Sequence, residues 1–178
     1  MGEEQRFGQV YDACHERVYR YAVRRVAPDA VEDIVAEVFL VAWRRRREIP
    51  EEPLPWLYGV ARRTVANHRR GRRRGENLVS ELRQQAEVGY EDPSVVEALQ
   101  VAWAWSQLAE ADQELLRLVA WEGLMTREIA PVLGCSAATA SVRLYRTRRR
   151  FQRLLDDAES GLGDTAQPCR PYEATREV

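Results

Sequence analysis

Arginines and short polar side chains recur on one face of the segment 137–155, where their chemistry suits DNA recognition. At about 100° per residue, a helix places these side chains together: Thr139, Val142, Arg146, Arg149 and Arg153. Arginine can bond a guanine edge through two parallel hydrogen bonds, and threonine or valine can touch a thymine methyl group. Arginines farther along the helix suit phosphates. An ordinary helical hairpin with a solvated basic face is the competing interpretation.

A shorter helix and a turn precede this segment, and together they predict a helix-turn-helix. Thr126 is placed to cap the first helix, and Gly134 suits the positive φ at which that helix ends. Ser136 can cap the second helix, which we expect to end near Leu155. The apolar side of the first helix comprises Ile129, Ala130, Val132 and Leu133. The back of the second helix is small or apolar, as a DNA-reading helix requires: Ala137, Ala140, Leu144, Thr147, Phe151 and Leu155.

A second group of arginines and aromatic side chains follows the proline-rich segment 48–55. Its three prolines predict a stiff, non-helical loop, with Pro55 in the first turn of a helix that follows. Trp56 and the apolar residues up to Val65 can face a core, which leaves Tyr58 exposed beside a set of arginines. Bases can stack on aromatic side chains while guanidinium groups follow the nucleic-acid backbone. A solvated basic helix with Trp56 in the core is the alternative.

The charge of the chain is arranged in blocks that its net charge of −1 hides. Residues 44–74 carry a net charge of +8 and residues 115–157 carry +4, whereas residues 75–114 between them carry −8. Two basic blocks separated by an acidic one indicate two nucleic-acid contacts on one chain.

Few residues offer catalytic or metal-binding chemistry. Cys14, Cys135 and Cys169 match no zinc spacing, and we expect reduced thiols. Asp33 and Glu37 lie one helical turn apart and could bind Mg²⁺, but contact with a protein partner is the favoured interpretation. No apolar run approaches the roughly 20 residues of a membrane span, and no signal sequence is evident. We therefore expect a cytoplasmic, nucleoid-associated protein that is not an enzyme, binds no metal or cofactor and does not insert into a membrane.

Hydrophobic periodicity along the rest of the chain predicts an all-α protein. Helices are expected from Phe7 to Val26, from about Asp29 to Arg46, and later over 95–108 and 111–121. Tyr11, Trp43 and Trp103 are among the side chains expected in the core. The chain then divides into two small helical domains, an acidic flexible linker between them and a disordered tail: 1–74, 95–157, 75–94 and 158–178, respectively.

Four stretches, in this order, resemble bacterial RNA polymerase sigma factors of the extracytoplasmic-function group. They are VEDIVAEVFLVAW (31–43), PWLYGVARRTVANHRRGRRR (55–74), LAEADQELLRLVAWEGLMTREIAPVLGCS (108–136) and ATASVRLYRTRRRF (138–151). The first two are similar to the family's region 2, and the last two to its region 4. The resemblance implies a non-enzymatic subunit that binds core RNA polymerase and directs promoter recognition, promoter melting and transcription initiation. An anti-sigma factor is a further partner that such proteins commonly have.

The resemblance also implies three sets of site residues. Contact with the β′ clamp helices of the polymerase falls on Asp33, Ala36, Glu37, Leu40 and Val41. Contact with the minus-10 promoter element falls on Trp56, Arg62, Arg63, Asn67, Arg69 and Arg70. Contact with the minus-35 element falls on Thr139, Ser141, Val142, Tyr145, Arg146, Arg148 and Arg149, in a region 4 that would also meet the β flap. The acidic linker would lie in the channel that later carries RNA.

Some residues depart from the family pattern. Ala36 and Val41 make the polymerase-facing surface more apolar than usual, and Ser141 and Val142 leave the minus-35 sequence open. Pro131 lies inside the first helix of the helix-turn-helix and could kink it. A one-component transcriptional regulator is the alternative function, but it leaves the first 75 residues without a role. An enzyme, such as a nuclease, is the least favoured alternative.

Overall fold

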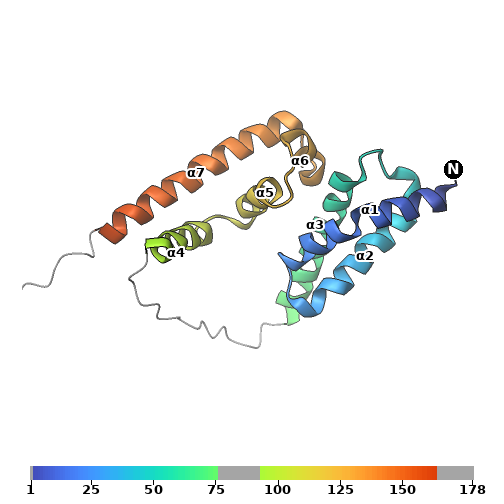
Figure 1. Cartoon of the computed structure of the whole chain (residues 1–178), viewed down its shortest axis with the longest axis horizontal. Helices are drawn as coiled ribbons and strands as arrows, with labels where there is room; N and C mark the ends of the chain where they lie inside the picture. Colours follow the sequence, from blue (N-terminus) through green and yellow to red (C-terminus); the bar gives the residue numbers. More distant parts are fainter. Residues whose placement is uncertain (1, 76–92, 164–178) are drawn as a thin grey trace, which may run out of the picture.

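The computed structural model describes residues 2–75 and 93–163, which form seven α-helices and two short 3₁₀ helices (Figure 1). The bounds are α1 Glu3–Val23, η1 Pro28–Ala30, α2 Val31–Arg44, η2 Arg46–Glu48, α3 Pro53–Gly75, α4 Pro93–Ser106, α5 Glu110–Ala120, α6 Thr126–Leu133 and α7 Ala137–Gly163. No strand occurs in these residues, so the predicted all-α class is confirmed for them. Of the predicted linker 75–94, residues 76–92 lie outside the described residues.

Helices α1, α2 and α3 pack together as the first of two helical groups (Figure 1). Their core consists of side chains at three- and four-residue steps, among them Val18, Val38 and Leu57, each fully buried. Burying a side chain of this size contributes roughly 1.5–3 kcal/mol. The prediction that Trp43 and Tyr11 lie in the core is wrong, since these side chains are 38% and 40% exposed.

The start of α3 corrects the prediction of a proline-rich loop. Pro53 and Pro55 both lie inside the helix, and only Pro50 stays in the loop before it. The first backbone N–H groups of a helix have no partner within it, so a proline there costs no hydrogen bond. Helix α3 therefore begins at Pro53, two residues earlier than expected.

Helices α4 to α7 form the second group, in which α7 runs along α4 and α5 (Figure 1). Trp105 on α4 makes edge-on contacts with Trp121 and Phe151, with ring centres 5.7 and 6.2 Å away. Trp103, expected in this core, is instead 44% exposed. Helix α7 continues to Gly163, so the expected disorder is wrong for residues 158–163, and residues 164–178 lie outside the described part.

The two groups lie against each other through α3 and α6, and the buried hydrophobic side chains of both belong to one continuous core. Gly59 on α3 lies at this contact. A Cβ atom at Gly59 would lie 3.6 Å from the carbonyl oxygen of Pro131 and 3.6 Å from the Cα of Val132. None of the described helices is both long and apolar enough to cross a bilayer.

Candidate nucleic-acid and polymerase interfaces

The turn before α7 fixes where the recognition face begins. Gly134 ends α6 with φ of 68°, and the Ser136 hydroxyl accepts a hydrogen bond from the Thr139 backbone N–H at 3.1 Å. Both predictions are confirmed, but the Thr126 cap is wrong. Thr126 is already helical, and the Glu128 carboxylate accepts from the Met125 N–H at 2.7 Å instead. Pro131 lies within α6, as expected, and the helix continues to Leu133.

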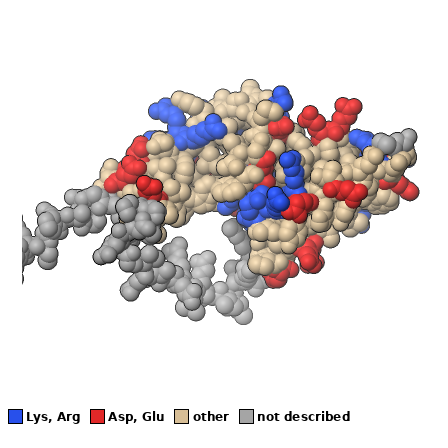
Figure 2. Space-filling view, in the orientation of Figure 1, with Lys and Arg blue, Asp and Glu red and all other residues tan. Residues whose placement is uncertain are grey.

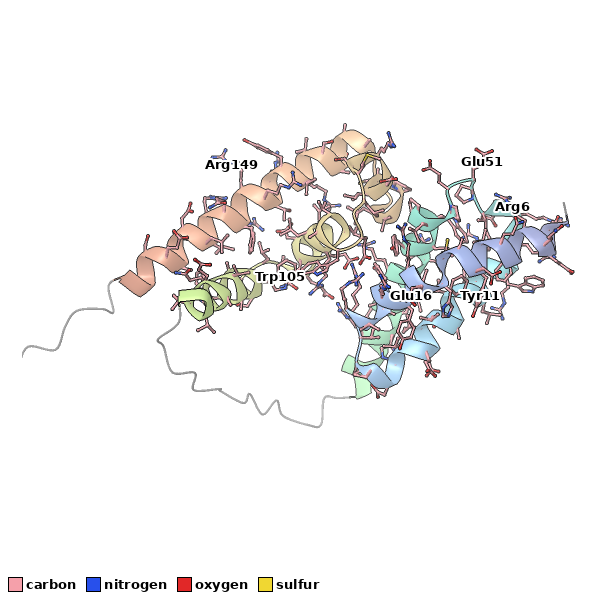
Figure 3. All side chains as sticks on the ribbon, viewed as in Figure 1. Arg6, Tyr11, Glu16, Glu51, Trp105 and Arg149 are labelled. Atoms are coloured by element: carbon pink, nitrogen blue, oxygen red, sulfur yellow. The ribbon has the colours of Figure 1, made fainter. Side chains whose placement is uncertain are left out.

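All seven residues predicted to read the minus-35 element are exposed on α7. Val142 and Tyr145 are 48% and 62% exposed, and Figure 3 shows Arg149 projecting from α7 away from α4 and α5. The back of the helix is buried, with Ala140, Leu144 and Thr147 at 0%, 8% and 3% exposure. The predicted division of this helix into two faces is therefore confirmed.

The seven residues do not share one direction. At about 100° per residue, Val142 and Arg149 point opposite to the buried back, whereas Ser141 and Arg148 lie on the flank about 90° away. The Thr139 hydroxyl lies 2.9 Å from that of Ser136, within the cap. The predicted minus-35 residues therefore lie partly on the front of α7, opposite the buried back, and partly on its flank.

A basic groove of about 550 Å³ runs along the other flank of α7. Asp112 of α5 closes one side, where its carboxylate accepts from Thr147 Oγ1 and Arg150 Nη1, both at 2.8 Å. The prediction missed two arginines of this groove, Arg143 and Arg150. The signal was present, because with Arg146 and Arg153 they recur at three- and four-residue steps. Figure 2 shows basic side chains over α7 and again where the two helical groups meet.

The six residues predicted for the minus-10 element divide between two faces of α3. Arg63, Asn67 and Arg70 are exposed, and Trp56 is half-buried near the start of the helix, with the Arg45 guanidinium 5.6 Å from its ring centre. Arg62 and Arg69 are half-buried, and Arg69 pairs with Glu110 of α5. The structure therefore brings five of the six around one cavity of about 630 Å³, and Trp56 lies outside it.

Acidic residues of the second helical group line the same cavity. Glu110 and Glu114 of α5 face the arginines of α3 across it. Arg69 forms an ion pair with Glu110, and its Nη2 donates to the Arg25 carbonyl oxygen at 2.7 Å. A residue expected to meet DNA is thus held by protein groups.

Arg25 is the centre of the contact between the two groups. Its guanidinium, 1% exposed, donates to Glu114 at 2.8 Å and to Glu122 at 2.9 Å, and lies 3.5 Å above the Tyr21 ring. Glu114 also accepts from Tyr21 Oη at 2.8 Å, and Glu122 accepts from Arg24 at 2.7 Å. Burial, and then the Glu114 charge, raise the pKa of Tyr21 well above its ordinary value.

Tyr58 corrects the predicted exposed side of α3. It is 2% exposed, and burial followed by the Glu122 charge raises its pKa to about 12. We call this contact between the groups the seam, and it comprises Tyr21, Arg24, Arg25, Tyr58, Gly59 and Arg69 on one side and Glu110, Glu114, Glu122, Pro131 and Val132 on the other.

The loop before α3 is tied to the first helix. Arg6 Nη2 donates to the carbonyl oxygens of Ile49 and Pro50, at 2.7 and 3.1 Å. Arg47 pairs with Glu3 at 2.8 Å. These contacts hold the loop against α1.

Four of the five residues predicted to contact polymerase are exposed on α2. Leu40 is 46% exposed next to Asp33, Ala36 and Glu37, whereas Val41 is half-buried against the core, so its predicted exposure is wrong. The prediction missed a row of rings beside this surface, joined by centroid distances of 4.7–6.4 Å: Trp43, Phe7, Tyr11, Phe39, His15 and Tyr19. The four-residue spacing of its members on α1 is the signal that could have found it.

Comparisons with known proteins match both helical groups. Sigma-70 region 2 matches residues 10–75 and sigma-70 region 4 matches residues 104–151. "ECF RNA polymerase sigma factor BldN" of Streptomyces coelicolor is 34% identical over 165 residues, which cover 88% of this chain and 62% of that protein. "Probable RNA polymerase sigma factor RfaY" of Xanthomonas campestris is 34% identical over 161 residues, covering 83% of this chain and 40% of that protein. The chain thus spans less than two thirds of either relative.

The fold is similar to a solved structure. The sigma factor RpoE of Bartonella quintana, crystallised with the anti-sigma factor NepR, has a TM-score of 0.59 and 22% identity, over 85% of this chain and 98% of that one. Matches to both sigma regions, in the predicted order, together with the 34% identity to an extracytoplasmic-function sigma factor, identify the family. The chain belongs to the bacterial RNA polymerase sigma factors of the extracytoplasmic-function group.

Proposed function

We propose that this chain binds core RNA polymerase and directs it to promoters, with α3 at the minus-10 element and α7 at the minus-35 element. The observation that carries the proposal is the presence of two basic helix faces on separate helical groups, with an exposed apolar and acidic surface on α2 beside the first. A subunit that positions an enzyme on DNA needs this combination of one protein-binding face and two DNA-binding faces.

At the minus-35 element, α7 would lie in the major groove. Val142, Arg146 and Arg149 on the front would meet base edges, with the methyl group of Thr139 placed for a thymine. Arg148, on the flank, would contact a phosphate, and so would Arg143 and Arg153 of the basic groove. Arg150 is held by Asp112 and contributes positive charge at the rim.

At the minus-10 element, Arg63, Asn67 and Arg70 on the exposed side of α3 would hold the separated strand. Trp56, with the neighbouring Arg45, offers a stacking surface for a base that has left the duplex. Removing a base from the stack costs a few kcal/mol, which stacking and phosphate contacts would offset. Arg62 and Arg69 would join this surface once the acidic residues of α5 have moved away.

The polymerase would dock on α2. Leu40 and Ala36 provide apolar contact, flanked by the carboxylates of Asp33 and Glu37. Such a surface suits the clamp helices of the β′ subunit, which the family resemblance implies as its partner. The Bartonella relative is bound to an anti-sigma factor, and we propose a partner of that class for this chain as well.

Reconstituted transcription tests the proposed function. Core RNA polymerase, free of other sigma factors, is combined with the chain on DNA fragments from the source genome. Promoter-specific transcripts are expected with the chain and not without it. Leu40→Arg should abolish polymerase binding, while the control Val101→Arg, at a similarly exposed apolar position on α4 outside the three predicted sets, should leave it intact. Tight, sequence-specific binding to DNA by the chain alone, with no association with core polymerase, would favour the one-component regulator instead.

A further inference from the structure

We propose that the cavity between α3 and α5 is a binding site for a small organic phosphate, held through its phosphate group by arginines of α3 and by the buried Arg25. The cavity has a volume of about 630 Å³, within the roughly 300–1,000 Å³ that small-molecule sites have. Residues of both helical groups line it, so the chain forms it without a partner. The charge of its walls and one buried donor both indicate an anionic ligand.

The side chains that line the cavity carry an excess of positive charge. Five of them are arginines and two are glutamates, which gives a net charge of +3. Each glutamate already forms an ion pair with one of the arginines, Glu110 with Arg69 and Glu114 with Arg25. The glutamates therefore leave most of the positive charge of the cavity without a countercharge on its walls.

Arg62 and Arg63 are the arginines best placed to receive a ligand. Among the residues that the structure describes, neither side chain has an ion pair or a hydrogen bond. A guanidinium presents parallel N–H groups that match the oxygens of a phosphate. A phosphate monoester carries a charge of about −1.5 to −2 at pH 7, so one such group would neutralise a large part of the excess.

Arg25 provides a donor that the protein leaves unused. Its side chain is 1% exposed, its Nε donates to Glu114, and its Nη1 donates to Glu122 and to the Tyr21 carbonyl oxygen. Its Nη2 is buried and has no hydrogen-bond partner within residues 2–75 and 93–163. Buried donors in folded proteins are nearly always hydrogen-bonded. Because Arg25 lines the cavity, a phosphate oxygen bound there would supply the acceptor.

The rest of the wall suits the organic part of the ligand. Val65 and Ala66 of α3 and Ala111 of α5 give it apolar surface, and Asn67 adds an amide. Small-molecule sites combine apolar surface with a few polar or charged groups in this way. Inorganic phosphate would use the arginines alone, so a phosphate ester is the better fit.

The site shares Arg62 and Arg63 with the predicted minus-10 set. A bound ester would occupy donors that DNA phosphates would need, and promoter opening would then respond to the concentration of the ligand. This consequence rests on the proposed function, whereas the binding site itself does not.

Ala111 and Ala120 offer a matched pair of substitutions on α5. Both are exposed and lie outside the three predicted sets of site residues, but of the two only Ala111 lines the cavity. Ala111→Glu adds a carboxylate to the cavity, whereas Ala120→Glu adds the same charge to the same helix elsewhere. Ala111→Gln adds a side chain of similar size without the charge.

Isothermal titration calorimetry of the full chain, in a phosphate-free buffer, tests the site. The probes are ribose 5-phosphate and AMP, with inorganic phosphate and adenosine for comparison. Both esters should bind at one site per chain, inorganic phosphate more weakly, and adenosine not at all. Ala111→Glu should weaken ester binding about tenfold or more, because its carboxylate repels the phosphate. Ala111→Gln should weaken it less, and Ala120→Glu should bind like wild type.

Circular dichroism checks that each variant is folded. If Ala111→Glu does not fold, Arg62→Gln decides, with Arg20→Gln as its control, because Arg20 is an exposed arginine of α1 outside the cavity. Arg62→Gln should weaken ester binding and Arg20→Gln should not.

Three results would overturn the inference. The first is no binding of either ester. The second is inorganic phosphate bound as tightly as the esters, which would indicate an adventitious ion only. The third is an equal loss for a cavity variant and its control, which would indicate general attraction to the charge of the chain. The titration needs neither DNA nor polymerase, so its failure leaves the proposed function intact, whereas absent promoter-specific transcripts would reject that function and not the site.

Discussion

The two surfaces that we propose for DNA binding, on α3 and on α7, differ in how freely they can be reached. The front of α7 is exposed along its length, and a cap at Ser136 fixes its first turn. The basic face of α3 lies at the seam, where Glu110 and the Arg25 backbone hold Arg69. The periodicity of α7 alone is enough to place its arginines on an exposed face. For α3, access to the basic face depends also on residues far away in the sequence that pack beside it.

Removing Arg25 should produce the largest loss of stability, because it acts on the seam that covers α3 and not on the exposed face of α7. Arg25→Ala leaves Glu114 and Glu122 buried without their shared countercharge, which should destabilise the folded chain by about 3–5 kcal/mol. Chemical denaturation followed by tryptophan fluorescence measures the loss. Arg20→Ala is the control, because the exposed pair between Arg20 and Glu16 contributes about 0.3–0.5 kcal/mol. Equal, small losses for both variants would mean that the seam is not a major stabilising contact.

Alkaline pH should weaken the seam. The pKa of Tyr58 is raised to about 12 and that of Tyr21 is raised well above 10, so the folded chain with the seam intact holds their protons more tightly than an unfolded chain. Stability is therefore fully present below about pH 10 and is lost as pH rises toward about 12. Tyrosine absorbance at 295 nm should show a late-titrating class that Gly59→Leu moves to lower pH, because the longer side chain has no space against α6 and disrupts the seam. The same titration in both chains would contradict this.

Substitutions on the front of α7 and on its flank should have different effects on the preference for minus-35 sequences. Arg146→Ala should cost roughly 1–3 kcal/mol and relax the preference at one minus-35 position. Arg148→Ala, on the flank, should weaken binding by a similar factor on every sequence and lower its salt dependence. Competition between randomised minus-35 elements bound by the polymerase complex measures both. An equal loss across all sequences for Arg146→Ala would make Arg146 a phosphate contact.

Removing the Ser136 cap of α7 should cause the smallest loss of stability. Ser136→Ala removes the acceptor for the Thr139 N–H and should cost about 1 kcal/mol of stability. Ser136→Asp is the matched control, because its carboxylate can accept the same hydrogen bond. Thermal unfolding measures both. A Ser136→Ala chain as stable as Ser136→Asp would show that this cap has no effect on the start of the reading face.

Local patterns predicted most of α7 and its turn. Gly134 and Ser136 have short-range roles, and the 100° periodicity placed Ala140, Leu144 and Thr147 on the buried side because these side chains repeat with the helix itself. The start of α3 was placed two residues late because Pro53 was assigned to the loop, although the first turn of a helix tolerates it as it does Pro55.

The seam could not be predicted in the same way. Arg25 and Glu114 are 89 residues apart, and nothing in the sequence around either one specifies the other. Tyr58 was expected on the exposed face for the same reason, since what buries it includes groups from the second helical group. The cavity around the predicted minus-10 residues results from this packing, and the spacing of residues along α3 could not predict it.

Footprinting of the chain together with core polymerase tests the central claim most directly. The claim is that one chain makes two DNA contacts, at elements held apart by the polymerase. On a promoter identified by transcription, hydroxyl-radical footprinting should show two protected segments about 25 base pairs apart, with permanganate-reactive thymines only at the downstream segment. One protected segment without reactive thymines, or the same footprint without polymerase, would contradict the account.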